Sequence, residues 1–143
     1  MRDYYRGGSQ SMQAYRVIEA WELGFNLGCV LKYCCRAGLK DGSSLDEDLQ
    51  KALDYIDFEV DFLDRVKTGA QRITRYESPA DVSCPSQYMP DEVADEWGLN
   101  EGRRRALKLI FKASLRFREG LIESAIEALE DLIPVVLEEK SNG

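Results

Sequence analysis

Apolar residues recur at steps of three and four along most of this chain, and that period restricts its fold more than any other feature. The stretch from 45 to 67 shows it best, because its apolar residues fall on one face when the segment is drawn as a helix. These residues are Leu49, Ala52, Leu53, Ile56, Val60 and Leu63. The same period marks residues 10–23, 25–39, 101–118 and 121–139, and more weakly 91–97. We therefore expect an all-α protein.

Local signals mark where these helices begin and end. Ser44 stands before the helix expected at 45–67, and Glu47 follows three residues later, as in a capping box. The preceding run GLKDGSS is typical of a break between helices. Pro134 lies late in the last helix and predicts either a kink or the closing turns, because proline removes one backbone hydrogen bond.

The connection between the two helical halves is unusually long. Residues 69–90 contain three of the four prolines and no helical period, so we expect a long connecting loop. A chain of 143 residues is long enough to bury one core without metal or disulfide staples. We expect a single all-α domain over 1–143, with one helical half up to residue 68 and a second from 91.

The two halves resemble each other. Residues 31–53 align without a gap with 107–129, so that Leu31 falls on Leu107 and Lys32 on Lys108. We expect two helical hairpins, with an internal pseudo-repeat of 25–64 and 101–139 as one interpretation. The other is that any two amphipathic hairpins match this well, because Leu, Ala and Lys are common in helices.

Composition excludes several classes of function. The chain has no histidine, which removes Ser-His and Cys-His nucleophilic pairs. Its formal net charge of −7 argues against a general binder of duplex DNA, which needs a broad basic face. Without histidine or a CxxC pair a structural zinc site is not expected. We interpret the four cysteines as reduced thiols that pack as small apolar residues: Cys29, Cys34, Cys35 and Cys84.

The sequence shows no feature of a membrane or secreted protein. Its apolar runs are far shorter than the ~20 residues of a membrane span. The first residues, MRDYYRGGSQ, are polar and lack the apolar core of a secretory signal. We expect a cytoplasmic protein without membrane contact.

A row of positive charges lies on one apolar segment, FNLGCVLKYCCRAGLKDG, residues 25–42. Lys32, Arg36 and Lys40 follow at steps of four, and no acid precedes Asp41 to pair with them within the helix. Gly28 and Gly38 would let another backbone or a ligand come close. Such cations suit phosphate, to which arginine offers a planar fork and lysine a movable charge. Two other interpretations stay open, namely a solvated face with snorkelling side chains, or neutralisation by the acidic helix that follows.

This segment and the DEDLQKALDYIDFEV that follows it resemble a bacteriophage family of small helical proteins, SaV-like, known as nucleotide kinases. The matching residues are Phe25, Gly28, Lys32, Tyr33, Arg36, Ala37, Gly38, Lys40, Asp48, Leu49, Lys51, Ala52 and Tyr55. The resemblance covers roughly residues 3–64. Two positions depart from the family pattern, since Tyr4 stands where a histidine is usual and Cys29 where an asparagine is usual. Asn26, two residues before Gly28, is our candidate to replace that amide.

The resemblance implies transfer of a phosphoryl group from a nucleoside triphosphate to a deoxynucleoside monophosphate, in a homo-oligomer, with ATP and Mg²⁺ as cofactors. The family lacks the usual phosphate loop, and this sequence contains no GxxxxGK[ST] either. Lys32, Arg36, Lys40 and Lys51 are the phosphate ligands that the resemblance implies, with Tyr4, Asn26 and Tyr33 as further ligand contacts. Asp48 would hold Mg²⁺ through water, or would only favour the helix dipole. No catalytic residue is assigned.

Three functions follow as hypotheses. The first is a phage deoxynucleoside monophosphate kinase in the host cytoplasm. The second is a non-catalytic sponge that captures a nucleotide or a nucleotide-derived signal of host defence, motivated by the departures at Tyr4 and Cys29. The third is an inhibitor whose acidic helices contact a basic host protein. For the first two we expect Lys32→Ala with Arg36→Ala to abolish nucleotide binding without unfolding the chain, because exposed cations seldom carry stability.

Overall fold

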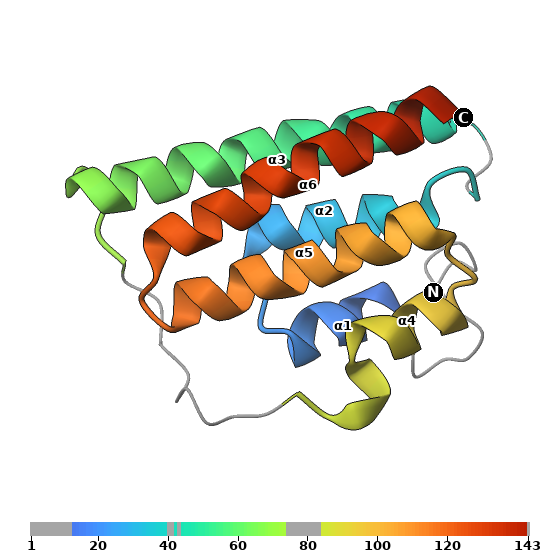
Figure 1. Ribbon diagram of the computed structural model, residues 1–143, viewed down its shortest axis with the longest axis horizontal. Coiled ribbons are helices and arrows are strands. Elements are labelled where there is room, and N and C mark those ends of the chain that lie inside the picture. Colours follow the sequence, from blue (N-terminus) through green and yellow to red (C-terminus); the bar gives the residue numbers. More distant parts are fainter. Residues whose placement is uncertain (1–12, 40–41, 43, 74–83, 143) are drawn as a thin grey trace.

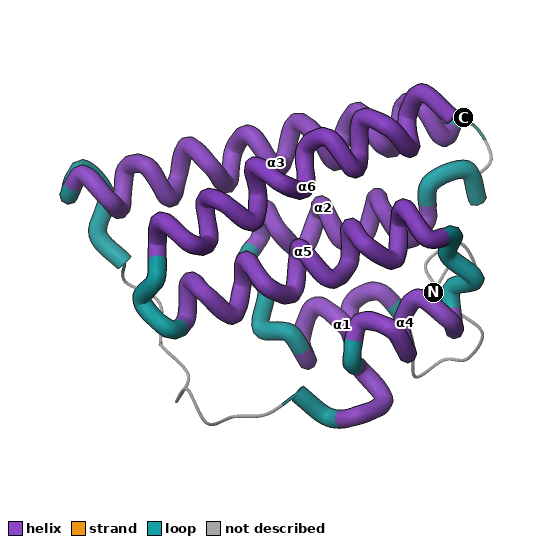
Figure 2. Tube along the Cα trace, in the orientation of Figure 1, coloured by secondary structure: helices purple, strands orange, loops and turns teal. Residues whose placement is uncertain are grey.

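The expected all-α class is confirmed. The computed structural model describes residues 13–39, 42, 44–73 and 84–142, and within these ranges all regular secondary structure is helical (Figure 2). The α-helices are α1 (Ala14–Ala20), α2 (Phe25–Arg36), α3 (Leu45–Thr68), α4 (Pro90–Glu96), α5 (Glu101–Arg118) and α6 (Ile122–Asn142), and a 3₁₀-helix, η3, covers Ser86–Tyr88.

Four long helices form the body of the molecule (Figure 1). Each of α2 and α5 packs against the helix that follows it in the chain, α3 and α6 lie side by side, and α2 contacts α5. The short helices α1 and α4 cover α2 and α5. Buried side chains from all six α-helices belong to one hydrophobic core. The internal pseudo-repeat, and the two hairpins as symmetric units, stay predictions.

Helix ends follow the sequence signals closely at α3 and less closely at α1 and α2. The Ser44 hydroxyl accepts a hydrogen bond from the Glu47 backbone N–H at 3.0 Å, which confirms the expected N-cap. α1 ends at Ala20, earlier than expected, because the chain turns at Glu22, whose φ is 53°. α2 ends at Arg36, so Leu39, expected on the buried stripe, is 56% exposed.

Two expectations about proline-containing segments need correction. The expected loop at 69–90 contains η3 and ends where α4 begins at Pro90; its residues 74–83 lie outside the described ranges. Pro134 does not mark the closing turns of α6, because the helix continues to Asn142. Buried Leu132, Val135 and Val136 flank this exposed proline, and their burial holds the helix on both sides. A kink at Pro134 stays a prediction.

An arginine of the second half of the chain donates hydrogen bonds to the C-terminal end of a helix in the first half. Arg103, in the first turn of α5, donates hydrogen bonds from Nη1 to the backbone oxygens of Cys34 at 3.4 Å and Ala37 at 3.2 Å. These carbonyls lie at the end of α2, where a helix has no internal donors left for its last oxygens. A cation at this position also interacts favourably with the negative, C-terminal end of the helix dipole. Glu139 of α6 lies 3.8 Å from the same guanidinium.

All four cysteines are free thiols, as expected. Cys29, Cys34 and Cys35 are buried in α2, whereas Cys84 is half-buried. Burial raises the pKa of the Cys34 thiol to about 12 and also raises the pKa of Cys35. The two thiols therefore stay protonated and unreactive in the folded chain, because the thiolate is the reactive form.

This arrangement predicts the pattern of thiol labelling. We expect an aromatic disulfide reagent at mildly alkaline pH to label Cys84 quickly and the three thiols of α2 only as fast as the chain opens. Absorbance of the released thiolate, with mass spectrometry of the labelled peptides, measures both phases. Labelling with denaturant present is the control for total thiol content. Fast labelling of any α2 cysteine in the folded chain would contradict the prediction.

Candidate functional site

Four aromatic side chains form a continuous series on the face shared by α2 and α3. Phe25 and Tyr33 come from α2, and Tyr55 and Phe58 come from α3; we call these four the aromatic cluster. The Tyr55 ring is central, with centroids 5.8 Å from Phe25, 6.1 Å from Tyr33 and 5.5 Å from Phe58. Phe25 is 75% exposed and Phe58 55% exposed. The cluster therefore offers ring faces to a partner outside the chain.

Three cations surround one ring of this cluster. The Tyr33 centroid lies 4.8 Å from Lys32 Nζ, 4.6 Å from Arg36 Cζ and 5.6 Å from Lys51 Nζ. Each distance is within the range of a cation–π contact. In the described part of the chain neither Lys32 nor Lys51 lies within ion-pair distance of a carboxylate. Two lysines thus lie near the aromatic cluster without a carboxylate partner among the described residues.

Arg36 differs from the two lysines, and its expected role needs correction. Its side chain is 3% exposed, and Nη2 lies 3.6 Å from Oδ1 of Asp48, which is 0% exposed. The steps of four do not keep Lys32 and Arg36 on one solvated surface, because Arg36 is buried against Asp48 of α3. Arg36 is a buried cation paired with a neighbouring helix. It is not an exposed member of a basic row.

The Arg36–Asp48 pair also bears on the expectation that Asp48 holds Mg²⁺ through water. A carboxylate that holds Mg²⁺ through water needs access to solvent, and this one is fully buried against a guanidinium. Asp48 therefore does not fit a magnesium ligand. It does lie in the first turn of α3, where an acid is favourable to the helix dipole.

The two glycines named from the sequence differ in role. A Cβ at Gly28 would meet the Ile18 side chain at 3.4 Å, an ordinary contact, so α1 does approach α2 closely at this glycine. Gly38 has a φ of +82°, which favours glycine, and its nearest neighbour would be Leu45 at 3.7 Å. Gly38 therefore serves the turn after α2.

A hollow of about 270 Å³ opens beside the aromatic cluster. It is lined by Ile18, Leu23, Gly24, Phe25, Gly28, Cys29 and Lys32. The Asn26 amide donates to Oε1 of Glu59 at 3.2 Å, so it joins α2 to α3 and does not line this hollow. The neighbouring Cys29 thiol raises the pKa of Tyr55, whose hydroxyl remains a hydrogen-bond donor near the hollow.

The structure therefore brings Lys32, Arg36 and Lys51 together around Tyr33, from the residues named in advance. Arg36 differs from the two lysines because it is buried and paired with Asp48. Tyr4 and Lys40 lie outside the described residues. The sequence reading gave no role to Phe25, Tyr55 and Phe58. A usable signal was present, because Tyr55 and Phe58 are three apart and off the buried stripe of α3.

Comparison with known proteins gives one partial match. Residues 4–57 match the model of a family described as a protein of unknown function, DUF3310. No curated protein and no solved structure matches the chain. The matched segment contains both lysines and three of the four rings of the candidate site, and leaves out Phe58. Over these residues the chain is similar to a family whose own function is undescribed.

Proposed function

We propose that the chain binds a nucleotide, or a closely related phosphorylated molecule with an aromatic ring, on the α2–α3 face. One observation carries this proposal: Lys32 and Lys51, without a carboxylate partner in the described ranges, stand beside an aromatic cluster whose Phe25 and Phe58 are exposed. The lysines and the rings of this face correspond to the phosphate and the base of a nucleotide.

The lysines suit the phosphate. An ammonium group donates to phosphate oxygens as a movable point charge, and such charge-assisted hydrogen bonds are stronger than neutral ones. The chain as a whole carries a formal net charge of −7, and the two lysines are a local positive charge that attracts an anionic group. Both lysines lie within cation–π distance of the Tyr33 ring.

The aromatic cluster suits the base. Stacking of a nucleobase on an exposed aromatic ring contributes roughly 1–3 kcal/mol, and it tolerates different bases because each has a π-face. Phe25 both borders the hollow and contacts Tyr55, so a base held there would lie next to Lys32. The phosphate would then reach the lysines within the same bound molecule.

Phosphoryl transfer is the less supported form of the proposal. A kinase without a phosphate loop must spread the transition-state charge over Mg²⁺ and positioned cations. Asp48 does not fit a magnesium ligand, Arg36 is engaged by Asp48, and the described residues include no group of three side chains that would hold a metal ion. Capture of a nucleotide without transfer is therefore the function that these residues support best.

A ligand screen tests the proposal. Purified full-length chain is titrated by calorimetry with ATP, each deoxynucleoside monophosphate and cyclic nucleotides, and its melting temperature is followed in parallel. Binding to the folded state stabilises it by about 2.7 kcal/mol at a ligand concentration of about 100 Kd, so a true ligand must raise the melting temperature. Absence of heat and of any melting shift at millimolar nucleotide would reject the proposal.

The same samples distinguish capture from catalysis. Incubation with ATP, Mg²⁺ and the deoxynucleoside monophosphate that binds best is expected to give no diphosphate product. Product that accumulates in proportion to the concentration of the chain would establish the kinase and overturn the non-catalytic form. Assembly as a homo-oligomer stays a prediction, which light scattering of the ligand-free chain measures.

A further inference from the structure

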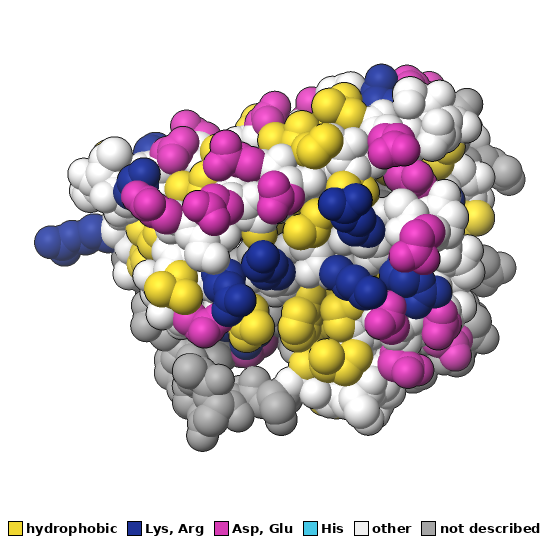
Figure 3. Space-filling model, in the orientation of Figure 1, with side chains coloured by type: hydrophobic (Ala, Val, Ile, Leu, Met, Phe, Trp, Pro, Cys, Tyr) yellow, Lys and Arg dark blue, Asp and Glu magenta, His cyan; other side chains and the backbone are white. Residues whose placement is uncertain are grey.

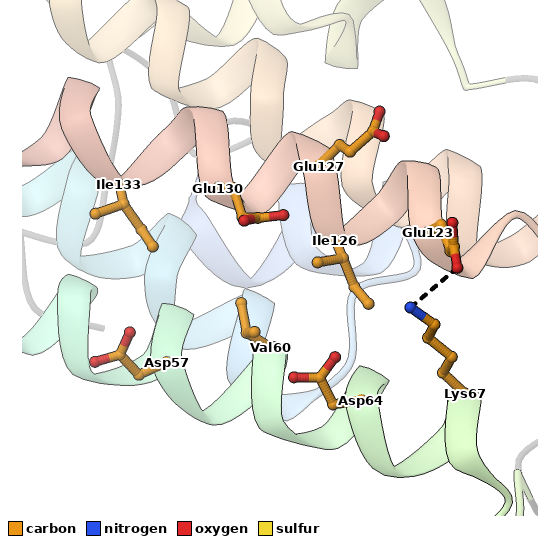
Figure 4. A pocket seen from close by; sticks show the side chains of 9 residues that line it. All are labelled: Asp57, Val60, Asp64, Lys67, Glu123, Ile126, Glu127, Glu130 and Ile133. Atoms are coloured by element: carbon orange, nitrogen blue, oxygen red, sulfur yellow. Dashed lines mark ion pairs between the residues drawn. The ribbon is translucent and has the colours of Figure 1, made fainter.

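A second concave surface lies on the other side of α3, where that helix meets α6. It encloses about 480 Å³ and is lined by Asp57, Val60, Asp64, Lys67, Glu123, Ile126, Glu127, Glu130 and Ile133, which we call the acidic groove (Figure 4). Val60 points from α3 toward α6, and Ile126 and Ile133 point from α6 toward α3. These three half-buried side chains form an apolar floor.

Acidic side chains border this floor from both helices. Lys67, the one cation of the lining, donates to Oε1 of Glu123 at 2.9 Å and closes one end of the groove. The remaining carboxylates make no ion pair with any described residue: Asp57, Asp64, Glu127 and Glu130. Acidic side chains gather over the same region of the surface, whereas basic side chains follow α5 (Figure 3). Four carboxylates without an ion-pair partner among the described residues therefore lie beside a half-buried apolar strip.

The lining residues lie one helical turn apart along both α3 and α6, so the groove follows the two helix axes. On α3 they fall at 57, 60, 64 and 67, and on α6 the apolar and acidic positions follow the same steps of three and four. The groove thus extends over about ten residues of α3, or about 15 Å. A third helix laid along it would meet apolar side chains in the middle and carboxylates on both sides.

A second copy of the chain docked through α5 matches only half of this surface. The exposed cations of α5 are Arg105, Lys108 and Lys112, which would suit the carboxylates. However, none of the large exposed apolar side chains in the described part of the chain comes from α5. A copy docked through α5 would leave the apolar floor uncovered.

We propose that the acidic groove binds a basic amphipathic helix of another protein. Apolar residues spaced at i, i+3 or i+4, and i+7 on that helix would pack on Val60, Ile126 and Ile133. Lysine or arginine on either side of its apolar stripe would pair with the carboxylates of α3 and α6. This is the helix-in-groove mode of recognition, in which apolar anchors give affinity and flanking charges give orientation and association rate.

The test uses a fluorescent synthetic peptide of roughly 18 residues, about five helical turns, with leucines on one face and lysines on the rest. Binding to the full chain is followed by fluorescence anisotropy. The groove variant Glu127→Gln with Glu130→Gln is compared with Glu92→Gln and Glu96→Gln on α4. Both pairs are exposed, and both remove two negative charges. We expect the groove variant to bind roughly fivefold more weakly and the α4 variant within about twofold of the parent, as for two solvent-screened ion pairs.

A scrambled peptide of the same composition, without an amphipathic face, is expected to bind at least about tenfold more weakly, because its leucines cannot share one face. Equal binding of the two peptides, or equal losses in the two variants, would show that only net charge is recognised and would overturn the proposal. If the parent chain self-associates and the groove variant does not, the occupant of the groove is a second copy of the chain. That result would also overturn the proposal. Circular dichroism confirms that both variants keep their helices.

Discussion

Replacing Arg36 with alanine is expected to lower the free energy of unfolding by about 3–5 kcal/mol, the loss found when one partner of a buried ion pair is removed. Arg36 is 3% exposed and lies 3.6 Å from Asp48, which is fully buried. The truncation would leave the Asp48 carboxylate in the interior facing a cavity. The premise of the sequence-based expectation for Lys32→Ala with Arg36→Ala, that both cations are exposed, is wrong for Arg36.

Urea unfolding followed by circular dichroism measures this loss. Lys32→Ala is the matched control on the same helix, and it is expected to change the free energy of unfolding by less than about 1 kcal/mol, because the lysine is half-exposed and has no carboxylate partner in the described residues. A double change, Arg36→Met with Asp48→Leu, is expected to recover much of the stability, because apolar pairs of similar volume often replace buried ion pairs. An Arg36→Ala chain as stable as Lys32→Ala would contradict the burial of the pair.

Removing Lys32 and Lys51 together is expected to weaken nucleotide binding roughly a hundredfold, the effect of losing two hydrogen bonds to a charged phosphate. Both ammonium groups lie near the Tyr33 ring, at 4.8 and 5.6 Å from its centroid, so both belong to the proposed phosphate-binding face. The free energy of unfolding should hardly change, because neither lysine makes an ion pair with a described residue.

Calorimetry with the best nucleotide of the screen measures this loss. The matched control is Arg105→Ala with Lys112→Ala, which removes two exposed positive charges from α5, away from the α2–α3 face. That control should bind within about threefold of the parent, since distant surface charges are screened at physiological ionic strength. If both variants lose affinity equally, the ligand responds to the overall charge of the chain and the α2–α3 site is wrong.

The best predicted element is α3, because three independent signals agree on it. The apolar period, the cap at Ser44 and the loss of helical period from residue 69 all lie in local sequence, and the helix extends from Leu45 to Thr68. α2 was less well predicted at its end, since its apolar pattern continues through Leu39 while the backbone turns at Gly38. Local pattern gives the type of an element more reliably than its last residue.

The candidate site was predicted in part. The spacing of Lys32 and Arg36 in the sequence predicts the same role for both. Only the position of α3 decides which of them lies next to a carboxylate. The open interpretation that the acidic helix neutralises the row holds for Arg36. Lys51 is in another helix and lies near Tyr33 only because α2 and α3 pack together. Its position near the same ring as Lys32 therefore cannot be predicted from local sequence.

The two hydrogen bonds from Arg103 to the end of α2 bear on which parts of this chain can exist alone. They join the segment that matches the family model, residues 4–57, to a helix encoded more than forty positions later. A truncated chain that stopped after α3 would lose this closure and would expose the faces of α2 and α3 that α5 and α6 now cover. Any shorter protein built on the matched segment would need a substitute for that cover, either from its own remaining sequence or from a neighbouring molecule.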